Sequence, residues 1–420
     1  MRLSKPKLFP TVWAFVWFIS FLLFILSIIL YYSYDSYREF ISKPFYYSYA
    51  KVITSYQKHK DNRAYTVIKL LTTNGLSIYI SSYPKQDYNN QILRVMLFPD
   101  NNISFGGYLG TFYTKAKIKK RLYLPISLKS KLLAEVSSQH KDRYIQSFYN
   151  AIFFATPLDM DLRTQITKLG VNHLVALSGF HLGILWGVIY GLLLLIYRPF
   201  SKRFFPYRYE LLDMGFVAIL ILGVYIIFVD LPPSLVRSYA MMSIGWVVLL
   251  LGMELISFTF LFAVLAILIT LYPPLLVSVA FWLSIAGVFY IYLLLFYTNE
   301  LNVWVKNLII IPFGIFILML PIIHTIFGVT SSYQLLSPLL SLLFIPFYPI
   351  VILFHILGLG SIFDTPLLYL FELPIDTTEE FLDLWYLVVY IVISLVAIVS
   401  RWIFYLLFVS SLVYAISIFL

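Results

Sequence analysis

Long apolar runs divide most of this chain into segments that are long enough to cross a membrane. A helix needs about 20 residues to span the hydrocarbon core of a bilayer. The pattern predicts about ten such helices, at residues 11–32, 172–197, 210–229, 233–251, 255–272, 274–297, 307–325, 338–358, 385–400 and 402–420. A shorter apolar stretch at residues 366–371 is a candidate re-entrant helix. We therefore expect a polytopic α-helical membrane protein.

Residues 33–130 follow another pattern, in which apolar and polar residues alternate. Alternation with a period of two is typical of half-buried β-strands. Four such segments are separated by turn residues, Asn74, Gly75 and Pro84 among them, and they cover residues 50–56, 64–71, 76–80 and 92–98. This pattern predicts an inserted all-β domain, a small barrel or sandwich. Residues 131–170 are then expected to form an amphipathic helical connector.

Composition agrees with a membrane protein, and charge sets residues 33–170 apart. Hydrophobic residues make up 61% of the chain and charged residues 12%, whereas globular domains carry about 25% charged residues. Between residues 33 and 170 there are 20 Lys and Arg against 9 Asp and Glu, a balance of +11 that accounts for the net charge of +10. Cysteine is absent, which excludes disulfides and thiolate metal sites.

Basic residues beside the first two spans predict the orientation, because Lys and Arg in short loops favour the cytoplasmic side. The N-terminus carries Arg2, Lys5 and Lys7, and the linker after residue 197 carries Arg198, Lys202, Arg203 and Arg208. Both therefore belong in the cytoplasm, and the β domain belongs outside. The first span is expected to be a retained signal anchor. The side of the acidic segment 361–384 stays open, since acidic residues orient loops weakly.

A cluster of seven basic residues without an acidic one lies between residues 115 and 131, with two tyrosines interleaved. Lys and Arg neutralise a phosphate backbone, and aromatic rings offer stacking faces to unpaired bases. Attraction to anionic lipid headgroups explains the same composition equally well. The candidate residues are Tyr113, Lys115, Lys117, Lys119, Lys120, Arg121, Tyr123, Lys129 and Lys131.

Polar residues inside the apolar runs are few, and each is a candidate for function because polarity in a bilayer costs several kcal/mol. A Ser-Gly-Phe-His step at residues 178–181 interrupts the second span, with His173 just before it. Arg237 lies about one turn inside a helix that Pro232 and Pro233 begin. The alternative for Arg237 is snorkelling to the interface beside Asp230. A second polar group surrounds residues 324–337, and His355 is a third, isolated point.

Common catalytic patterns are missing from the sequence. The six histidines show neither H-x-H nor H-E-x-x-H spacing, and neither a G-x-S-x-G elbow nor a phosphate-binding P-loop is present. We therefore expect no cofactor, no metal and no enzymatic activity. Residue pattern alone leads to a membrane protein with a basic external domain and a polar path.

A resemblance adds to this interpretation. Residues 161–183, DLRTQITKLGVNHLVALSGFHLG, resemble the signature of the ComEC family, inner-membrane DNA-uptake channels of naturally competent bacteria, which runs close to hLLAiSGLHvg. Three further segments resemble family motifs in the family's order: LPPSLVRSYAMM, YPPLLVSVAFWLSIAGV and YQLLSPLLSLLFIPF. Two positions depart from the family pattern, Trp282 in place of Gln and Ser341 in place of Asn.

The resemblance implies a channel core at residues 171–360 and an OB-like fold for residues 33–130. Residues 361–420 lie beyond the resemblance and are expected from their own pattern to form an acidic segment and the final spans. The resemblance further implies that single-stranded DNA passes through the inner membrane into the cytoplasm during natural transformation. The positions expected to line or shape the path are His173, Ser178, Gly179, His181, Pro233, Ser234, Arg237, Ser284, Gln334, Ser337 and Ser341.

The resemblance also implies partners. They are DNA, the lipid bilayer, a periplasmic DNA receptor, a separate nuclease and a cytoplasmic helicase or ATPase, and homo-oligomerisation stays open. Long family members continue into a metallo-β-lactamase-like domain, and we expect this chain to be a short form without it. Two other classes remain. A secondary transporter of an anionic or lipid-linked solute would also need an intramembrane Arg, and a membrane-embedded hydrolase would pair Ser178 with His181 or His173.

Overall fold

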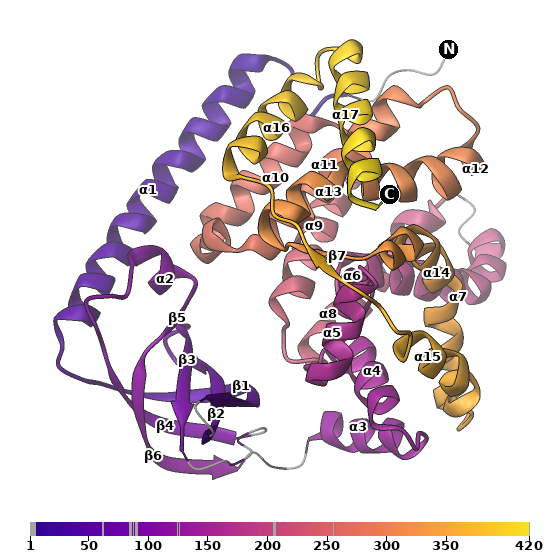
Figure 1. Ribbon diagram of the computed structural model, residues 1–420. Helices are drawn as coiled ribbons and strands as arrows, with labels where there is room; N and C mark the ends of the chain where they lie inside the picture. The colour runs from indigo at the N-terminus through magenta and orange to yellow at the C-terminus, as the bar shows by residue number, and fades with distance from the viewer. Residues whose placement is uncertain are drawn as a thin grey trace. The chain divides into compact units, whose positions relative to one another are not determined.

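The computed structural model describes residues 6–60, 63–83, 86, 88, 91–123, 125, 127–204, 207–254 and 256–419. Most of them are helical, and six strands form one sheet (Figure 1). The chain forms two compact units. The first, which we call the β unit, comprises Phe9–Leu128 and Phe262–Phe281, and the second, the helical unit, comprises Lys129–Leu261 and Trp282–Leu420 with the N-terminal residues up to Leu8. The predicted turn residue Pro84 and the basic residues Arg2 and Lys5 lie outside the described residues.

The four alternating segments of the sequence are strands of the β unit, so that prediction is confirmed. The strands are β1 Tyr46–Lys60, β2 Arg63–Thr72, β3 Ser77–Ser82, β4 Gln91–Phe98, β5 Thr111–Tyr113 and β6 Lys115–Tyr123. Between β2 and β3 the chain turns at Gly75, whose φ of 81° is in the left-handed region that glycine adopts without strain. The Asn-Gly pair therefore makes the hairpin turn that it predicts.

The strand order is β5-β3-β2-β1-β4-β6, with every pair antiparallel except β3 and β5. Only Thr114 separates β5 from β6, so the two strands at the ends of this order follow one another in the chain and the ring of pairings closes. Alternate residues point inward, and the wholly buried ones are Ile68, Leu70, Ile78, Ile80, Leu93, Val95 and Leu97. A closed ring removes exposed sheet edges.

Helix α1, Val12–Ser42, belongs to the β unit and is long enough to cross a bilayer and continue toward the sheet. Its 31 residues correspond to about 46 Å, against a hydrocarbon core of about 30 Å. The helix starts at Thr11, whose side chain accepts a hydrogen bond from the amide of Ala14. Near its end Phe40 is buried and packs on Phe112 at the sheet and Tyr108 of α2, Phe105–Leu109.

The remaining helices are α3 Leu128–Ser138, α4 Arg143–Phe154, α5 Met160–Lys168, α6 Asn172–Val175, α7 Gly179–Phe204, α8 Glu210–Phe228, α9 Pro233–Leu250, α10 Phe258–Leu271, α11 Val279–Tyr297, α12 Val303–Val305, α13 Ile311–Ile326, α14 Ser337–Ile356, α15 Asp364–Phe371, α16 Leu384–Val396 and α17 Arg401–Phe419. Short 3-10 turns cover Pro273–Val277, Ser332–Leu336 and Gly360–Phe363, and a π-helical turn, Lys306–Ile310, joins α12 to α13. A two-residue strand β7, Val329–Thr330, pairs with β8, Thr378–Glu379.

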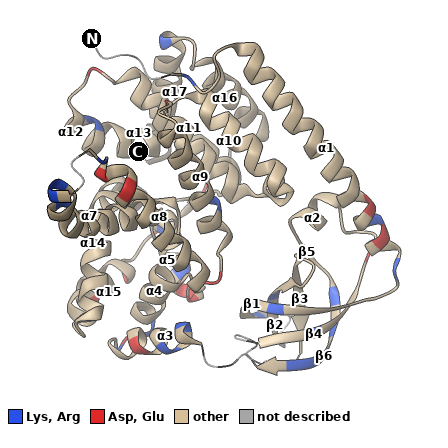
Figure 2. Ribbon diagram, turned by 180° about the vertical axis from the view of Figure 1, so that it is seen from behind, with Lys and Arg blue, Asp and Glu red and all other residues tan. Residues whose placement is uncertain are grey.

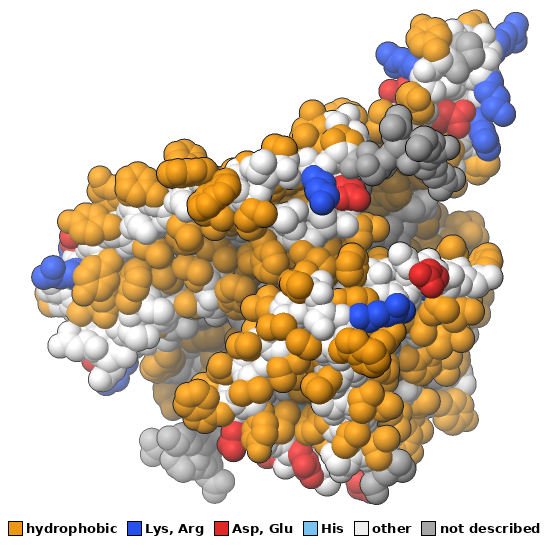
Figure 3. Space-filling model, turned by 90° about the horizontal axis from the view of Figure 1, so that it is seen from above, with side chains coloured by type: hydrophobic (Ala, Val, Ile, Leu, Met, Phe, Trp, Pro, Cys, Tyr) orange, Lys and Arg blue, Asp and Glu red, His pale blue; other side chains and the backbone are white. Residues whose placement is uncertain are grey.

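Within the described residues, eight helices are long and apolar enough to span a membrane. Two of the ten predicted spans are shorter: α10 has 14 residues and α16 has 13, about 20 Å each. Hydrophobic side chains cover most of the face that Figure 3 shows, and charged ones are few there. Such a surface is stable in lipid and not in water.

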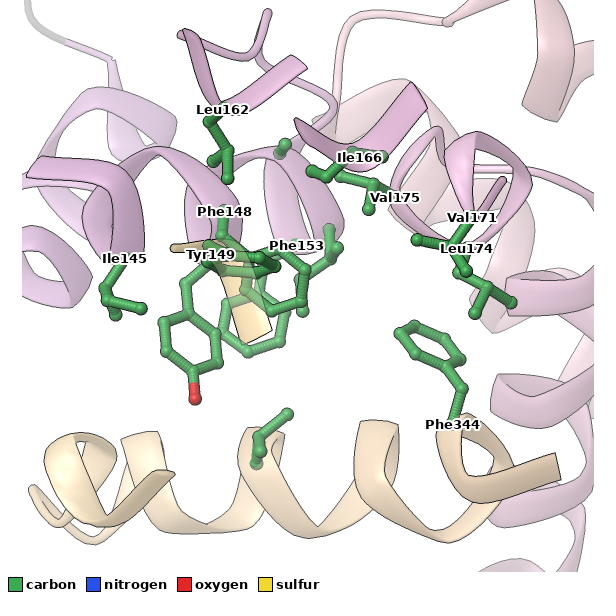
Figure 4. Packing of buried hydrophobic residues seen from close by; sticks show 14 of the residues in the cluster. Ile145, Phe148, Tyr149, Phe153, Leu162, Ile166, Val171, Leu174, Val175 and Phe344 are labelled. Carbon is green, nitrogen blue, oxygen red and sulfur yellow. The ribbon is translucent and has the colours of Figure 1, made fainter. Parts of the chain in front are cut away.

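The connector is helical, but it is not a surface helix throughout. Asp142 caps α4 by accepting hydrogen bonds from the amides of Tyr144 and Ile145. Seven residues of α4 are buried, and Figure 4 shows several of them pointing toward α14, which carries Phe344. Helix α4 is therefore apolar on more than one side because it is buried on more than one side.

Candidate functional site

The second predicted span is broken at the polar step. Residues 172–175 form the short α6, and α7 begins only at Gly179, so the helix expected over residues 172–197 is two helices. Breaking a helix exposes backbone carbonyls that need partners, above all in a bilayer. Ser234 donates to the carbonyl oxygen of Leu177 at 2.7 Å, which satisfies one of them.

The start of α9 packs closely on this break. Proline at the first helical position suits a helix start, because its missing N–H needs no partner there. A Cβ on Gly179 would lie 3.0 Å from the hydroxyl oxygen of Ser238. Ser238 in turn donates to the carbonyl oxygen of Ser234 at 2.9 Å. The lack of a side chain at Gly179 therefore lets α7 and α9 approach, and Pro233 at the helix start is exposed.

On its other side the break meets the start of α14. Ser337 donates to the carbonyl oxygen of Gly170 at 3.1 Å, and the Nε2 atom of His173 lies 3.0 Å from the hydroxyl oxygen of Ser341. Gly170 has a φ of 69°, and a Cβ there would meet the side chain of Gln334 at 3.1 Å. Gln334 itself donates to the carbonyl oxygen of Val329 at 2.9 Å. Residues far apart in the chain are thus gathered around residues 170–181.

Arg237 is buried in the helical unit, with 7% of its surface exposed. Its Nη2 atom donates to the hydroxyl oxygen of Ser284 on α11 at 3.1 Å. Asp230 accepts a hydrogen bond from Lys129 at 2.9 Å. Because a snorkelling side chain keeps its charged end in water, the buried position of Arg237 argues against the snorkelling alternative.

Ser178 and His181 are also neighbours. The Nδ1 atom of His181 accepts a hydrogen bond from the backbone amide of Ser178 at 3.3 Å and lies 3.4 Å from its hydroxyl oxygen. An accepting Nδ1 places the imidazole hydrogen on Nε2, and that atom has no hydrogen-bond partner within the described part of the chain. Rings of Phe344 and Tyr348 surround it, with centroids 5.1 and 5.0 Å from that of the imidazole.

Ten of the eleven path candidates lie around residues 170–181 and the contact of Arg237 with Ser284. Two of their hydroxyls, those of Ser234 and Ser337, donate to backbone carbonyls of residues 170–181. Gln334 joins them through Gly170 and links them to the second polar group, where His324 Nε2 lies 2.9 Å from the hydroxyl of Thr330. Ser238 and Thr330 were missed by sequence reasoning, because single Ser and Thr residues are common in membrane helices and bond back to their own backbone.

The basic run of residues 115–131 is divided by the fold. Five of its members lie on β6 and are exposed: Lys115, Lys117, Lys119, Lys120 and Arg121 (Figure 2). Lys129 and Lys131 belong to α3, and Lys129 bonds both to Asp230 and to the carbonyl oxygen of Val229. The candidate nucleic-acid surface of the β unit therefore rests on β6.

The two interleaved tyrosines are exposed, Tyr113 at 55% and Tyr123 at 77%. The hydroxyl of Tyr113 lies 2.8 Å from that of Ser81. Tyr113 and Lys115 line an open hollow of about 520 Å³ together with Lys43 and Asp100. Tyr113 thus lies at a hollow that two lysines and one aspartate also line.

Sequence reasoning missed an aromatic and basic group on β1 and β4. Tyr47 and Tyr49 are exposed on β1, and the guanidinium of Arg94 on β4 lies 5.7 and 5.8 Å from their ring centroids. Tyr49 pairs with Arg94, which pairs with Lys120 on β6. The sequence did indicate this group, because Tyr47 and Tyr49 are two residues apart and such residues share one face of a strand. We call Tyr47, Tyr49 and Arg94 the stacking group.

These features define the class: a multi-pass membrane protein with a small β-sheet unit and polar side chains gathered at a broken helix. Residues 155–419 match the Competence protein family, and because that match covers more than half of the chain, the protein belongs to this family. Its family associates it with DNA uptake in competence, and the family's domain is of channel type rather than catalytic. No curated protein and no solved structure matches the chain.

Proposed function

We propose that this protein is an inner-membrane channel that passes single-stranded DNA into the cytoplasm during natural transformation. The single observation that carries the proposal is the buried Arg237, held by Ser284 inside a helix of membrane-spanning length. An Arg in such a place costs several kcal/mol unless it has a task or a partner. A polyanion crossing a bilayer needs this kind of charge, and family membership supports DNA as that polyanion.

The β unit is proposed to be an external OB-like domain that receives DNA. Its closed ring of pairings and its parallel β3 and β5 support that fold. The lysines of β6 would concentrate the polyanion by releasing counterions. The stacking group would hold successive bases without regard to sequence, as aromatic platforms do in single-strand binding proteins.

Passage of a strand with many charges calls for several weak sites rather than one tight site, by the logic that governs ion conduction. Arg237, Ser178 and His173 are proposed to be such sites, because each carries a polar atom at or near the break. The hydroxyls of Ser234 and Ser337 bond to backbone carbonyls and are proposed to hold the broken helix in shape. Energy, a nuclease and a DNA receptor are proposed to come from other proteins.

The test is a series of Arg237 variants in naturally competent cells that make the protein. Arg237→Ala should abolish transformants while fluorescent DNA still collects outside the inner membrane, because receipt and passage use different residues. Arg237→Lys, which keeps the charge, should restore part of the activity. Arg401→Ala, at the exposed start of α17, is the matched control and should behave as wild type.

Two results would turn the proposal down. Normal transformation by Arg237→Ala at an unchanged protein level removes Arg237 from the path. Normal transformation in a full deletion as well means that DNA passage is not this protein's task, and a secondary transporter for an anionic solute then explains the buried Arg better.

A further inference from the structure

Three titratable side chains that the proposed path does not use form a hydrogen-bonded chain in the helical unit. His140 lies in the turn between α3 and α4, His355 in the last turn of α14, and Asp364 at the start of α15. The Nδ1 atom of His140 lies 2.9 Å from Oδ1 of Asp364, and its Nε2 atom lies 2.9 Å from Nε2 of His355. Both imidazoles are buried. The expectation that His355 stands isolated is therefore wrong.

The contact between His355 and Val351 fixes where the hydrogens of this hydrogen-bonded series lie. His355 Nδ1 lies 2.6 Å from the carbonyl oxygen of Val351, which can only accept, so this nitrogen carries a hydrogen. Neutral His355 then accepts at Nε2, and the hydrogen between the two imidazoles belongs to Nε2 of His140. When His140 is neutral its Nδ1 accepts in turn, and the donor at that point has to be a protonated carboxyl of Asp364.

If the same proton lies on His140 instead, His140 is an imidazolium and Asp364 is a carboxylate. The total number of hydrogens is the same in both arrangements. In either arrangement the chain holds one proton more than an ionised Asp364 with two neutral imidazoles. Without that proton, one of the two contacts joins a pair of acceptors at 2.9 Å. Two acceptors repel at that distance, so the observed geometry requires the extra proton.

Burial favours the uncharged forms of Asp364 and His140. Burial raises the pKa of Asp364 and lowers the pKa of His140, and in both cases it outweighs the attraction between the two groups, which acts in the opposite direction. The negative charge of Asp142 raises the pKa of Asp364 further. The ring of Tyr149 on α4 stacks on His140 with centroids 4.6 Å apart, and burial raises the Tyr149 pKa, so the phenol stays neutral. A protonated Asp364 donating to neutral His140 agrees with all three directions.

The three segments that carry these side chains are also packed tightly against one another. Gln139 donates to the carbonyl oxygen of His355 at 3.0 Å and accepts from the amide of Gly360 at 2.9 Å. A Cβ on Gly360 would lie 2.5 Å from the Oε1 atom of Gln139 and 2.8 Å from the His355 ring. The turn before α4, the end of α14 and the turn before α15 therefore meet without spare volume.

We propose that Asp364, His140 and His355 form a proton-binding site that fastens the α3–α4 turn to α14 and α15. The site stores a proton and does not conduct it, because the chain ends at the carbonyl of Val351, which cannot pass one on. A carboxyl with a raised pKa keeps its proton at low pH and loses it as the pH rises through that pKa. The junction is closed below that pH and opens above it. This goes beyond the proposed passage of DNA.

The test is hydrogen exchange by mass spectrometry on the full-length protein in lipid nanodiscs between pH 5 and pH 9, corrected for intrinsic exchange rates. Peptides covering residues 139–146 and 357–366 should lose protection in the wild type, by up to about tenfold per pH unit above the pKa of the site. Peptides around His324, whose bonds to Leu320 and Thr330 need no extra proton, are the internal control and should keep a constant protection.

Two variants separate protonation from packing. Asp364→Asn supplies an N–H to His140 Nδ1 without any extra proton, so its junction should stay protected at every pH. Gly360→Ala breaks the contact sterically and should expose the same peptides at every pH, but the comparison of Asp364→Asn with wild type stands even if Gly360→Ala fails to fold. Equal pH profiles for wild type and Asp364→Asn overturn the proposal.

Discussion

At the scale of single residues, the broken helix depends on side chains that are small or that bond to carbonyls. Gly179 lets α9 approach, and Ser234 satisfies the carbonyl of Leu177. An unsatisfied carbonyl in a bilayer costs several kcal/mol. The polar step SGFH therefore has a structural task, whether or not DNA contacts it.

Gly179→Ala is predicted to destabilise the protein by about 1–3 kcal/mol, the usual cost of overpacking a tight contact, because its Cβ would lie 3.0 Å from Ser238 Oγ and 3.2 Å from Ser238 Cβ. Thermal unfolding in detergent measures the effect. Gly183→Ala, one turn further along α7 with no atom within 4 Å of its Cβ, should be neutral. Combining Gly179→Ala with Ser238→Gly should restore stability, and a failure to do so would assign the loss to another contact.

Ser178→Ala is predicted to keep transformation within a few-fold of wild type, because the hydroxyl is one weak contact among several. A hydrolase with Ser178 as nucleophile would instead lose all activity. Counting transformants decides between the two. A serine-reactive fluorophosphonate should leave the wild type unlabelled, and labelling that Ser178→Ala abolishes would restore the hydrolase alternative.

Residues near a break were found from the sequence because polarity stands out in an apolar run. His173, Ser178, His181 and Arg237 all belong to this kind. The contact of His140 with His355 gave no such signal, because 215 positions separate the two in the chain. A lone histidine has no partner that spacing can reveal, and only the folded chain brings these two imidazoles together.

At the scale of secondary-structure elements, alternation predicted four of the six strands of the sheet and missed β5 and β6. Hydropathy predicted ten spans, and eight helices of the described residues are long enough to cross a membrane. It overestimated the lengths of two of them, α10 and α16, because apolar residues continue into the turns at their ends. It also joined α6 to α7, since three residues of extended chain hardly change a hydropathy average. The closure of the sheet through β5 and β6 depends on pairings between distant strands, which a periodic pattern does not encode.

The stacking group is predicted to bind single strands through its rings. Tyr49→Ala should weaken binding of a fluorescent oligonucleotide to the full-length protein in nanodiscs by about 5-fold to 150-fold, the range for one stacked base. Fluorescence anisotropy measures it. Tyr83→Ala removes another exposed tyrosine, 65% exposed at the end of β3, and should have little effect. Equal losses in both variants would mean that Tyr49 has no special role.

The lysines of β6 should act through charge alone. Charge reversal at Lys117 and Lys120 is predicted to weaken DNA binding for every sequence tested and to flatten the dependence of binding on salt, because fewer counterions are released. A titration between 50 and 300 mM salt checks this. If binding is lost for vesicles of anionic lipid and is unchanged for DNA, the headgroup alternative for this strand is correct.

At the scale of the whole molecule, the predicted orientation can be tested directly, because the chain contains no cysteine. A cysteine at Asn101 in the β unit should react with a membrane-impermeant maleimide in intact spheroplasts. A cysteine at Tyr207, in the basic linker between α7 and α8, should react only after permeabilisation, since positive loops stay inside. The opposite pattern would reverse the orientation. A third cysteine at Glu379 reports the side of the acidic segment.

The central claim is that DNA passes beside Arg237, and a photo-crosslink measures it most directly. A photoreactive amino acid at Ser284, the residue that Arg237 contacts, is illuminated while competent cells take up labelled linear DNA. The lipid-facing control is the same amino acid at Val224 on α8, which is 69% exposed. The account predicts a single-stranded DNA adduct at position 284 and none at position 224. Equal adducts at both positions, or none at 284 while transformation proceeds, would contradict it.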